Sequence, residues 1–113
     1  MLNKRRQRRK KQKKVVEQTM IGKIIDLPME EFKEELVKQR VNIGTMKNLI
    51  LNLESIYFEL RNGKEAIIKA YLENRLSSSE AEDAVNGIYA EMIKIEEKIT
   101  FLKIKVTELV NVD

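Results

Sequence analysis

The chain has 113 residues, with 22 lysines and arginines against 18 acids, and neither cysteine nor histidine. The length suits one small domain. The missing residues exclude disulfides, thiol nucleophiles and the commonest metal ligands. We therefore expect a protein that is not an enzyme, with no catalytic residue, no metal and no cofactor.

The first segment, residues 1–14, is strongly basic. From Asn3 to Lys14, nine of twelve residues are cations and none is acidic or apolar. Such a density of like charge keeps a segment extended and attracts polyanions. It predicts a basic arm that binds nucleic-acid phosphates without sequence specificity. The binding residues would be Lys4, Arg5, Arg6, Arg8, Arg9, Lys10, Lys11, Lys13 and Lys14.

Other partners fit the arm as well. The stretch Arg5-Arg6-Gln7-Arg8-Arg9-Lys10-Lys11 resembles the arginine-rich RNA-binding peptides of lentiviral transactivators and lambdoid antiterminators, which implies RNA as a partner. The arm has no aromatic residue to stack on bases, so backbone contacts are favoured. An acidic protein surface, a nuclear-import receptor or an anionic lipid surface would attract the same charges. Nucleic acid matches best because each neutralised phosphate releases counterions.

The second segment, residues 15–27, is apolar at helical spacing, with Val16, Met20, Ile24 and Leu27 on one face. A helix this short is marginal alone, so we expect it to be ordered only when docked. No uninterrupted hydrophobic run exceeds three residues, so we expect neither a signal peptide nor a membrane span. The expected location is the cytoplasm or the inside of a virion.

From residue 28 onward, apolar residues alternate at steps of three and four, which is the pattern of a coiled-coil seam. The seam from Met29 to Asn74 is interrupted only by Gln39, Lys64 and Asn74, and a second seam runs unbroken from Ala81 to Leu109. The pattern predicts an all-α fold, with residues 28–113 forming a long antiparallel, coiled-coil-like hairpin. Its helices should cover about 28–75 and 80–110.

Three features bear on the helix ends. Pro28 suits the first turn of the first helix. Ser79 with Glu82 fits a capping box at the start of the second helix. Asn62-Gly63 often marks a turn, but the seam continues across it, which favours a bend over a break. A break would instead give three pieces, at 28–61, 64–76 and 79–110.

The second helix also carries apolar residues on the side opposite its seam. At 100° per residue, Ala90 lies there with Ile93, Phe101 and Ile104. A two-helix hairpin would leave this strip in water, so we predict that Ile93, Phe101 and Ile104 form a protein interface. The interface would serve self-association or docking on a larger assembly.

Two functions fit these features. The first is a structural assembly protein, such as a phage scaffold or capsid-internal protein, whose helices dock on protein while its arm holds nucleic acid. The second is a dimeric regulatory DNA- or RNA-binding protein acting in antitermination, repression or partition. A sequence-specific regulator would be expected to carry a reading element such as a helix-turn-helix. None is apparent in the chain, which favours the first function.

Overall fold

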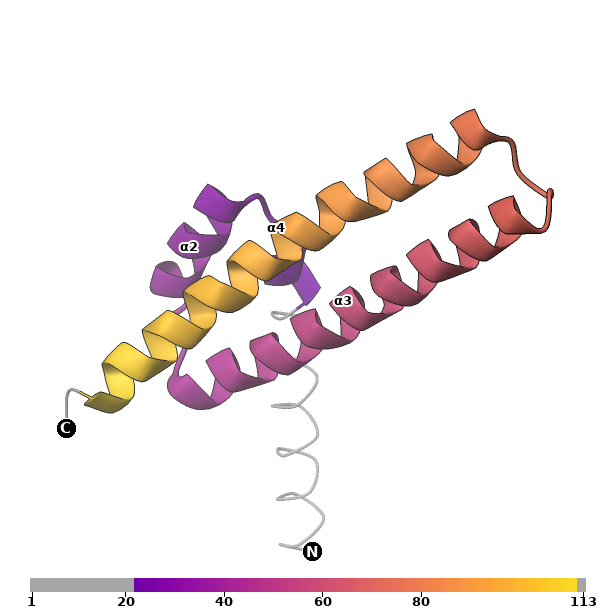
Figure 1. Cartoon of the computed structure of the whole chain (residues 1–113). Coiled ribbons are helices and arrows are strands. Elements are labelled where there is room, and N and C mark those ends of the chain that lie inside the picture. The colour runs from indigo at the N-terminus through magenta and orange to yellow at the C-terminus, as the bar shows by residue number, and fades with distance from the viewer. Residues whose placement is uncertain (1–21, 112–113) are drawn as a thin grey trace, which may run out of the picture. The chain divides into compact units, whose positions relative to one another are not determined.

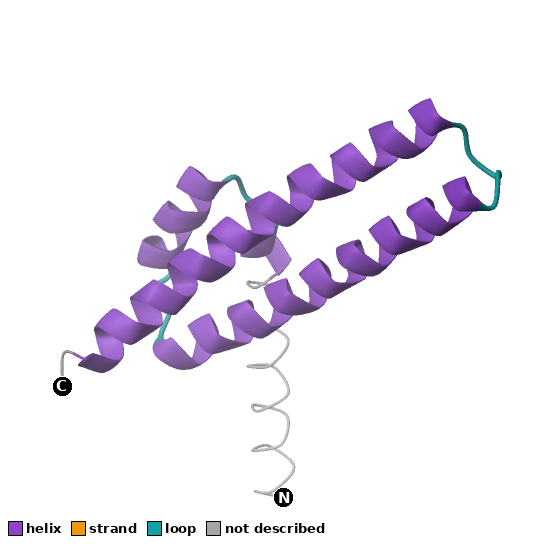
Figure 2. Cartoon of the chain, viewed as in Figure 1, coloured by secondary structure: helices purple, strands orange, loops and turns teal. Residues whose placement is uncertain are grey.

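The computed structural model describes residues 22–111, and within that range every regular element is a helix (Figure 2). A short helical turn at residues 22–25 precedes α2 (Met29–Lys38), α3 (Ile43–Leu72) and α4 (Ser78–Asn111). The basic arm at 1–14, and most of the connecting segment at 15–27, lie outside the described residues. The predicted all-α class is confirmed for the described part of the chain.

The chain divides into two compact units, residues 1–41 and 42–113. In the second unit, α3 and α4 run antiparallel and pack along each other, joined by a short turn at 73–77 (Figure 1). The prediction of two long helices that pack together is confirmed here. In the first unit, Pro28 directly precedes α2, and Ile24, Phe32 and Leu36 are buried.

A single helix over 28–75 was expected, and this expectation is wrong: the chain leaves the helix after Lys38 and starts a new one at Ile43. Arg40 adopts a left-handed conformation with φ of 50°. The Arg40 N–H donates to Val37 O and the Val41 N–H to Leu36 O, which together form the Schellman motif that ends many helices. The backbone thus satisfies its own last carbonyls without a glycine.

Asn42 opens the next helix. Its Oδ1 accepts a hydrogen bond from the Thr45 N–H at 2.8 Å, so the side chain satisfies a donor that would otherwise lack a partner in the first turn of α3. The Schellman motif at Arg40, which ends α2, is therefore followed almost directly by the N-cap at Asn42, which starts α3. Together they divide what the seam pattern reads as one helix.

Gly63 lies inside α3 and ends nothing. A Cβ built on Gly63 would lie 3.7 Å from Ile88 Cδ1, an ordinary van der Waals distance. A glycine within a helix costs about 1 kcal/mol relative to alanine. Packing of α3 on α4 offsets that cost, so the helix continues through the Asn62-Gly63 pair.

Helix α4 begins two residues before the position that the sequence predicted. The Glu80 N–H donates to Ser77 Oγ at 3.1 Å, and the Ser77 hydroxyl donates to Glu80 Oε1 at 2.9 Å. Ser77 is therefore the N-cap, and the predicted box of Ser79 with Glu82 is wrong. The two candidates share the same spacing, since each serine has a glutamate three positions later.

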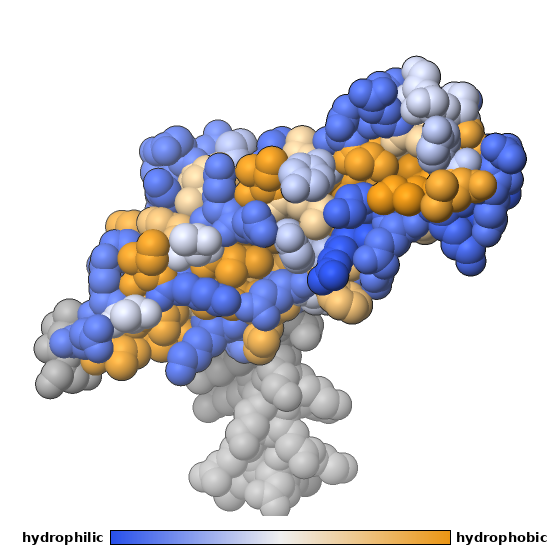
Figure 3. All heavy atoms as spheres, in the orientation of Figure 1, coloured by the Kyte–Doolittle hydropathy of each residue, from blue (hydrophilic) through white to orange (hydrophobic). Residues whose placement is uncertain are grey.

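Burial differs along the hairpin. We call residues 43–54 with 91–111 the base and residues 55–90 the tip. At the base, eight side chains are fully buried, five of which belong to the seam: Met46, Leu53, Met92, Ile95 and Leu102. Apart from Thr45 and Lys98, the buried side chains at the base are large and apolar. At the tip, only Ala81 is fully buried, and seam residues such as Leu60, Ile67 and Ile88 are half-buried. Apolar atoms accordingly reach the surface between α3 and α4 towards the tip (Figure 3).

Candidate interaction surfaces

The nine cations predicted to bind nucleic acid, Lys4 to Lys14, lie outside the described residues. Their role remains a prediction from the sequence. In residues 42–111, the exposed large apolar side chains belong to α3 and α4.

The three residues of the predicted protein interface on α4 differ in their exposure to solvent. Ile93 and Ile104 are 46% and 53% exposed, whereas Ile95 and Leu102 on the facing side are buried. Phe101 is only half-buried, and the Lys105 ammonium lies 5.9 Å from its ring centroid. Tyr89 is also exposed, and it precedes Ile93 by one helical turn. The accessible strip of α4 is therefore made by Tyr89, Ile93 and Ile104.

A second apolar surface lies on α3, and the sequence analysis missed it. Leu51, Phe58 and Leu72 are 65%, 60% and 73% exposed, more than any other large apolar side chain of residues 42–111. They are separated by seven and fourteen residues, so they share one face of the helix. We call these three residues the α3 ridge. The signal that could have found it is this second seven-residue repeat, half a turn away from the seam.

Polar contacts cross from α3 to α4 at three levels of the hairpin. Lys103 Nζ lies 3.5 Å from Glu54 Oε1, Tyr57 shares a side-chain hydrogen bond with Glu96, and Lys64 Nζ lies 5.5 Å from the Tyr89 ring centroid. The hydrogen bond with Glu96 is the main cause that raises the pKa of Tyr57, followed by desolvation. Exposed contacts of this kind contribute little to stability, but a shifted pairing of the helices would break them all together.

The polar residues of the first seam have different explanations. Lys64 contacts Tyr89, whereas Gln39 and Asn74 lie at helix ends. Asn74 adopts φ of 61°, a left-handed conformation that asparagine tolerates better than most residues. The Asn74 N–H donates to Tyr71 O and the Arg75 N–H to Ala70 O, which repeats the Schellman motif at the end of α3.

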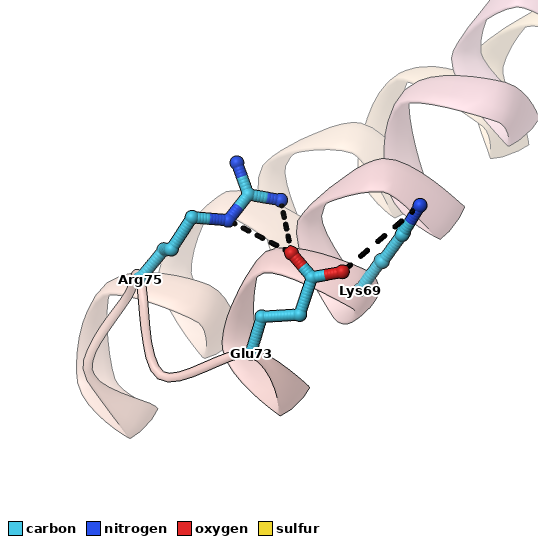
Figure 4. A network of polar contacts seen from close by, with 3 residues as sticks. All are labelled: Lys69, Glu73 and Arg75. Carbon is cyan, nitrogen blue, oxygen red and sulfur yellow. Dashed lines mark hydrogen bonds and ion pairs between the residues drawn. The ribbon is translucent and has the colours of Figure 1, made fainter.

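A small charge network surrounds this helix end. The Glu73 carboxylate accepts from Arg75 Nε at 3.0 Å and Nη2 at 2.8 Å, and Lys69 Nζ lies 4.0 Å from its other oxygen (Figure 4). All three side chains are largely exposed to water, so each ion pair contributes less than about 1 kcal/mol. The network links the last turn of α3 to the turn at 73–77.

No group of three or more side chains that could hold a metal occurs within residues 22–111. Within the same residues, no helix is long and apolar enough to cross a lipid bilayer.

The chain matches no protein-family model, and it has no significant match among curated proteins or solved structures.

Proposed function

We propose that the protein is a non-enzymatic structural component of a larger assembly. Its helical hairpin contacts protein, either further copies of this chain or the surface of a larger lattice. Its basic arm binds nucleic-acid phosphates without reading sequence. A phage scaffold or a capsid-internal protein combines these two properties.

One observation carries the assembly part of the proposal: Ile93 and Ile104 are about half exposed on the face of α4 that points away from its seam. Burying the exposed half of each side chain against a partner gains roughly 1 kcal/mol, half of what complete burial of an isoleucine contributes. A chain that has no partner gains nothing from them. The accessible strip of α4 therefore supports contact with another protein.

The arm supports the nucleic-acid part through its charge alone. Nine cations in twelve residues are joined to a remainder of the chain with 13 cations and 18 acids, a net charge of −5. The acidic remainder is repelled by phosphates, so the affinity would reside in the arm. If about six cations engage duplex phosphates, the logarithm of affinity falls against the logarithm of salt concentration with a slope of roughly −5.

The test of the arm uses the full chain and two nucleic acids of unrelated sequence. Fluorescence anisotropy across a salt series should give equal affinities for both, with the steep slope. Replacing all nine arm cations by glutamine should abolish binding, while replacing the exposed Lys47 and Lys94 of the body should leave it unchanged. A slope near zero would refute the proposal. A footprint on one discrete site would favour the regulatory function instead.

The test of the α4 strip is assembly. The double variant Ile93→Glu with Ile104→Glu should associate more weakly than the wild-type chain, which sedimentation velocity detects as a smaller fraction of large species. Its helix content should be unchanged. Ala66→Glu, at an exposed position of α3, is the matched control for the added charge. Equal behaviour of the double variant and the control would remove the α4 strip from the proposal.

A further inference from the structure

The α3 ridge carries an inference of its own. Leu51, Phe58 and Leu72 lie on the outer face of α3, and they are the three most exposed large apolar side chains of residues 42–111. Leu51 and Leu72 are 21 positions apart, which is roughly 32 Å along a helix. A line of this length suits another helix better than a small ligand.

The charges beside the ridge decide which orientation a second copy can take. Glu65 fills the one heptad position that the ridge leaves open, and Glu54 and Arg61 flank it. In a parallel pair of α3 helices, each of these residues would meet its own copy. Like charges at close range destabilise a pair, so three levels of the parallel arrangement are repulsive.

The antiparallel arrangement removes two of these three repulsions, because the two copies of Glu54 and the two copies of Glu65 then lie far apart along the helices. The two Arg61 side chains still lie close to the two-fold axis. With a two-fold axis between Arg61 and Asn62, Leu51 comes level with Leu72 of the second copy, and Glu54 comes level with Lys69 of the second copy. Phe58 comes level with Glu65, whose carboxylate lies 3.8 Å from Arg61 Nε in its own chain and whose methylene groups can face the ring. Every contact of such a pair occurs twice.

We infer that the α3 ridge is a homodimer interface, in which α3 of one chain packs antiparallel on α3 of a second copy around Arg61 and Asn62. The inference rests on the proposed self-association and names the surface that performs it. It leaves the α4 strip free on both copies. A dimer made through α3 could therefore still bind a neighbour through α4, which is how a pair becomes a building block of a lattice.

The first experiment uses the absence of cysteine from the chain. Glu54→Cys and Lys69→Cys proteins are mixed in equal amounts and oxidised, and disulfide-linked species are separated by mass. The expected product is the mixed dimer, because only this register brings the two positions within disulfide reach. Leu51→Cys alone should not cross-link to itself. Self-linking of Leu51→Cys, or no mixed dimer, would overturn the antiparallel arrangement.

The second experiment measures the dimer itself. Sedimentation equilibrium of the full chain should give a dimer, and Leu51→Glu with Phe58→Glu should raise its dissociation constant at least roughly 100-fold, since two apolar contacts are lost in each chain. Ala66→Glu is the control for charge, and circular dichroism verifies that helix content is unchanged. A monomeric wild-type chain, or a dimer that survives the double variant, would overturn the inference.

The variants also separate this inference from the proposed function. If Ile93→Glu with Ile104→Glu dissolves the dimer and the ridge variant does not, the α4 strip is the dimer surface, so the inference fails while self-association stands. If neither variant changes the dimer, the inference and the α4 strip fail together. Binding of nucleic acid by the arm is measured independently in every case.

Discussion

The base and the tip of the hairpin are built from the same two helices, yet they are held together differently. Of the nine fully buried residues in 42–111, eight lie at the base and one, Ala81, at the tip. The base places Met46, Leu49 and Leu53 of α3 among the buried residues, with Met92, Ile95 and Leu102 of α4. The base is thus the packed end of the molecule.

The tip is packed with smaller side chains. Gly63 and Ala70 of α3 and Ala84 of α4 are half-buried there, and Lys64 occupies a seam position. Small residues remove little apolar area from water, so each level of the tip contributes less free energy than a level at the base. The comparison teaches that stability is concentrated at the base. The tip can therefore change its conformation on binding a partner at a smaller cost in free energy.

The largest effect should come from cutting into the base. Leu53→Ala removes a side chain with no exposed surface and should lower the free energy of unfolding by about 2–5 kcal/mol. Ile67→Ala, at a half-buried tip position, should cost only about 1 kcal/mol. Urea unfolding followed by far-ultraviolet circular dichroism measures both, with Val110→Ala, at an exposed position outside the α3 ridge and the α4 strip, as control. Equal costs at Leu53 and Ile67 would break the comparison.

A smaller effect is expected at the N-cap of each long helix. Asn42 directly precedes α3, next to the base, and Ser77 directly precedes α4 at the tip, and each side chain accepts a hydrogen bond from the backbone N–H three residues later. Asn42→Ala and Ser77→Ala should each cost about 1 kcal/mol in unfolding free energy. Ser79→Ala should be neutral, because Ser79 caps nothing. A Ser79 variant as unstable as the Ser77 variant would restore the start that the sequence predicted.

The two left-handed residues offer a gain rather than a loss. Arg40, just before the base, and Asn74, at the tip, have φ of 50° and 61°. Arg40→Gly should raise the free energy of unfolding by about 0.5–1 kcal/mol, because glycine adopts this conformation without strain. The gain is measured as a higher thermal midpoint. Asn74→Gly should gain less, since asparagine already tolerates it. A loss of stability on Arg40→Gly would show that its side chain has another role.

The smallest effect concerns pH. The hydrogen bond with Glu96 raises the pKa of Tyr57, so the folded state favours the protonated phenol. This contribution is fully present below the ordinary tyrosine pKa of about 10 and is lost as pH rises through the folded value. Tyr57→Phe should remove that alkaline loss, and ultraviolet titration should show one late tyrosine missing. If the titration that disappears in Tyr57→Phe has an ordinary midpoint rather than a late one, the assigned hydrogen bond is contradicted.

The sequence predicted the helical class and the faces that meet, because a seam of alternating threes and fours leaves each helix one apolar side. It missed the break at residues 39–42, since Leu36, Gln39 and Ile43 keep the seam in phase across it. No glycine marks that stop, and Arg40 takes the left-handed conformation instead. The one readable signal was Asn42, which caps Thr45.

Other details could not be decided from residue types. Ser77 with Glu80 and Ser79 with Glu82 have the same spacing, and only the folded turn at 73–77 selects the first pair. Of the predicted interface, Ile93 and Ile104 are exposed, but a pattern could not show that Phe101 is partly covered. The roles of these three residues and of the arm cations stay predictions.

Gly63 and Gly87 make the tip more susceptible to local unfolding than the base. A methyl group would fit at both positions, since the added atom would meet only Ile88 Cδ1 at Gly63 and nothing at Gly87. The native chain therefore forgoes backbone rigidity that two alanines would supply. When pulled, heated or exposed to a protease, the hairpin would unzip from this stretch first, and amide exchange there would outpace that of the base.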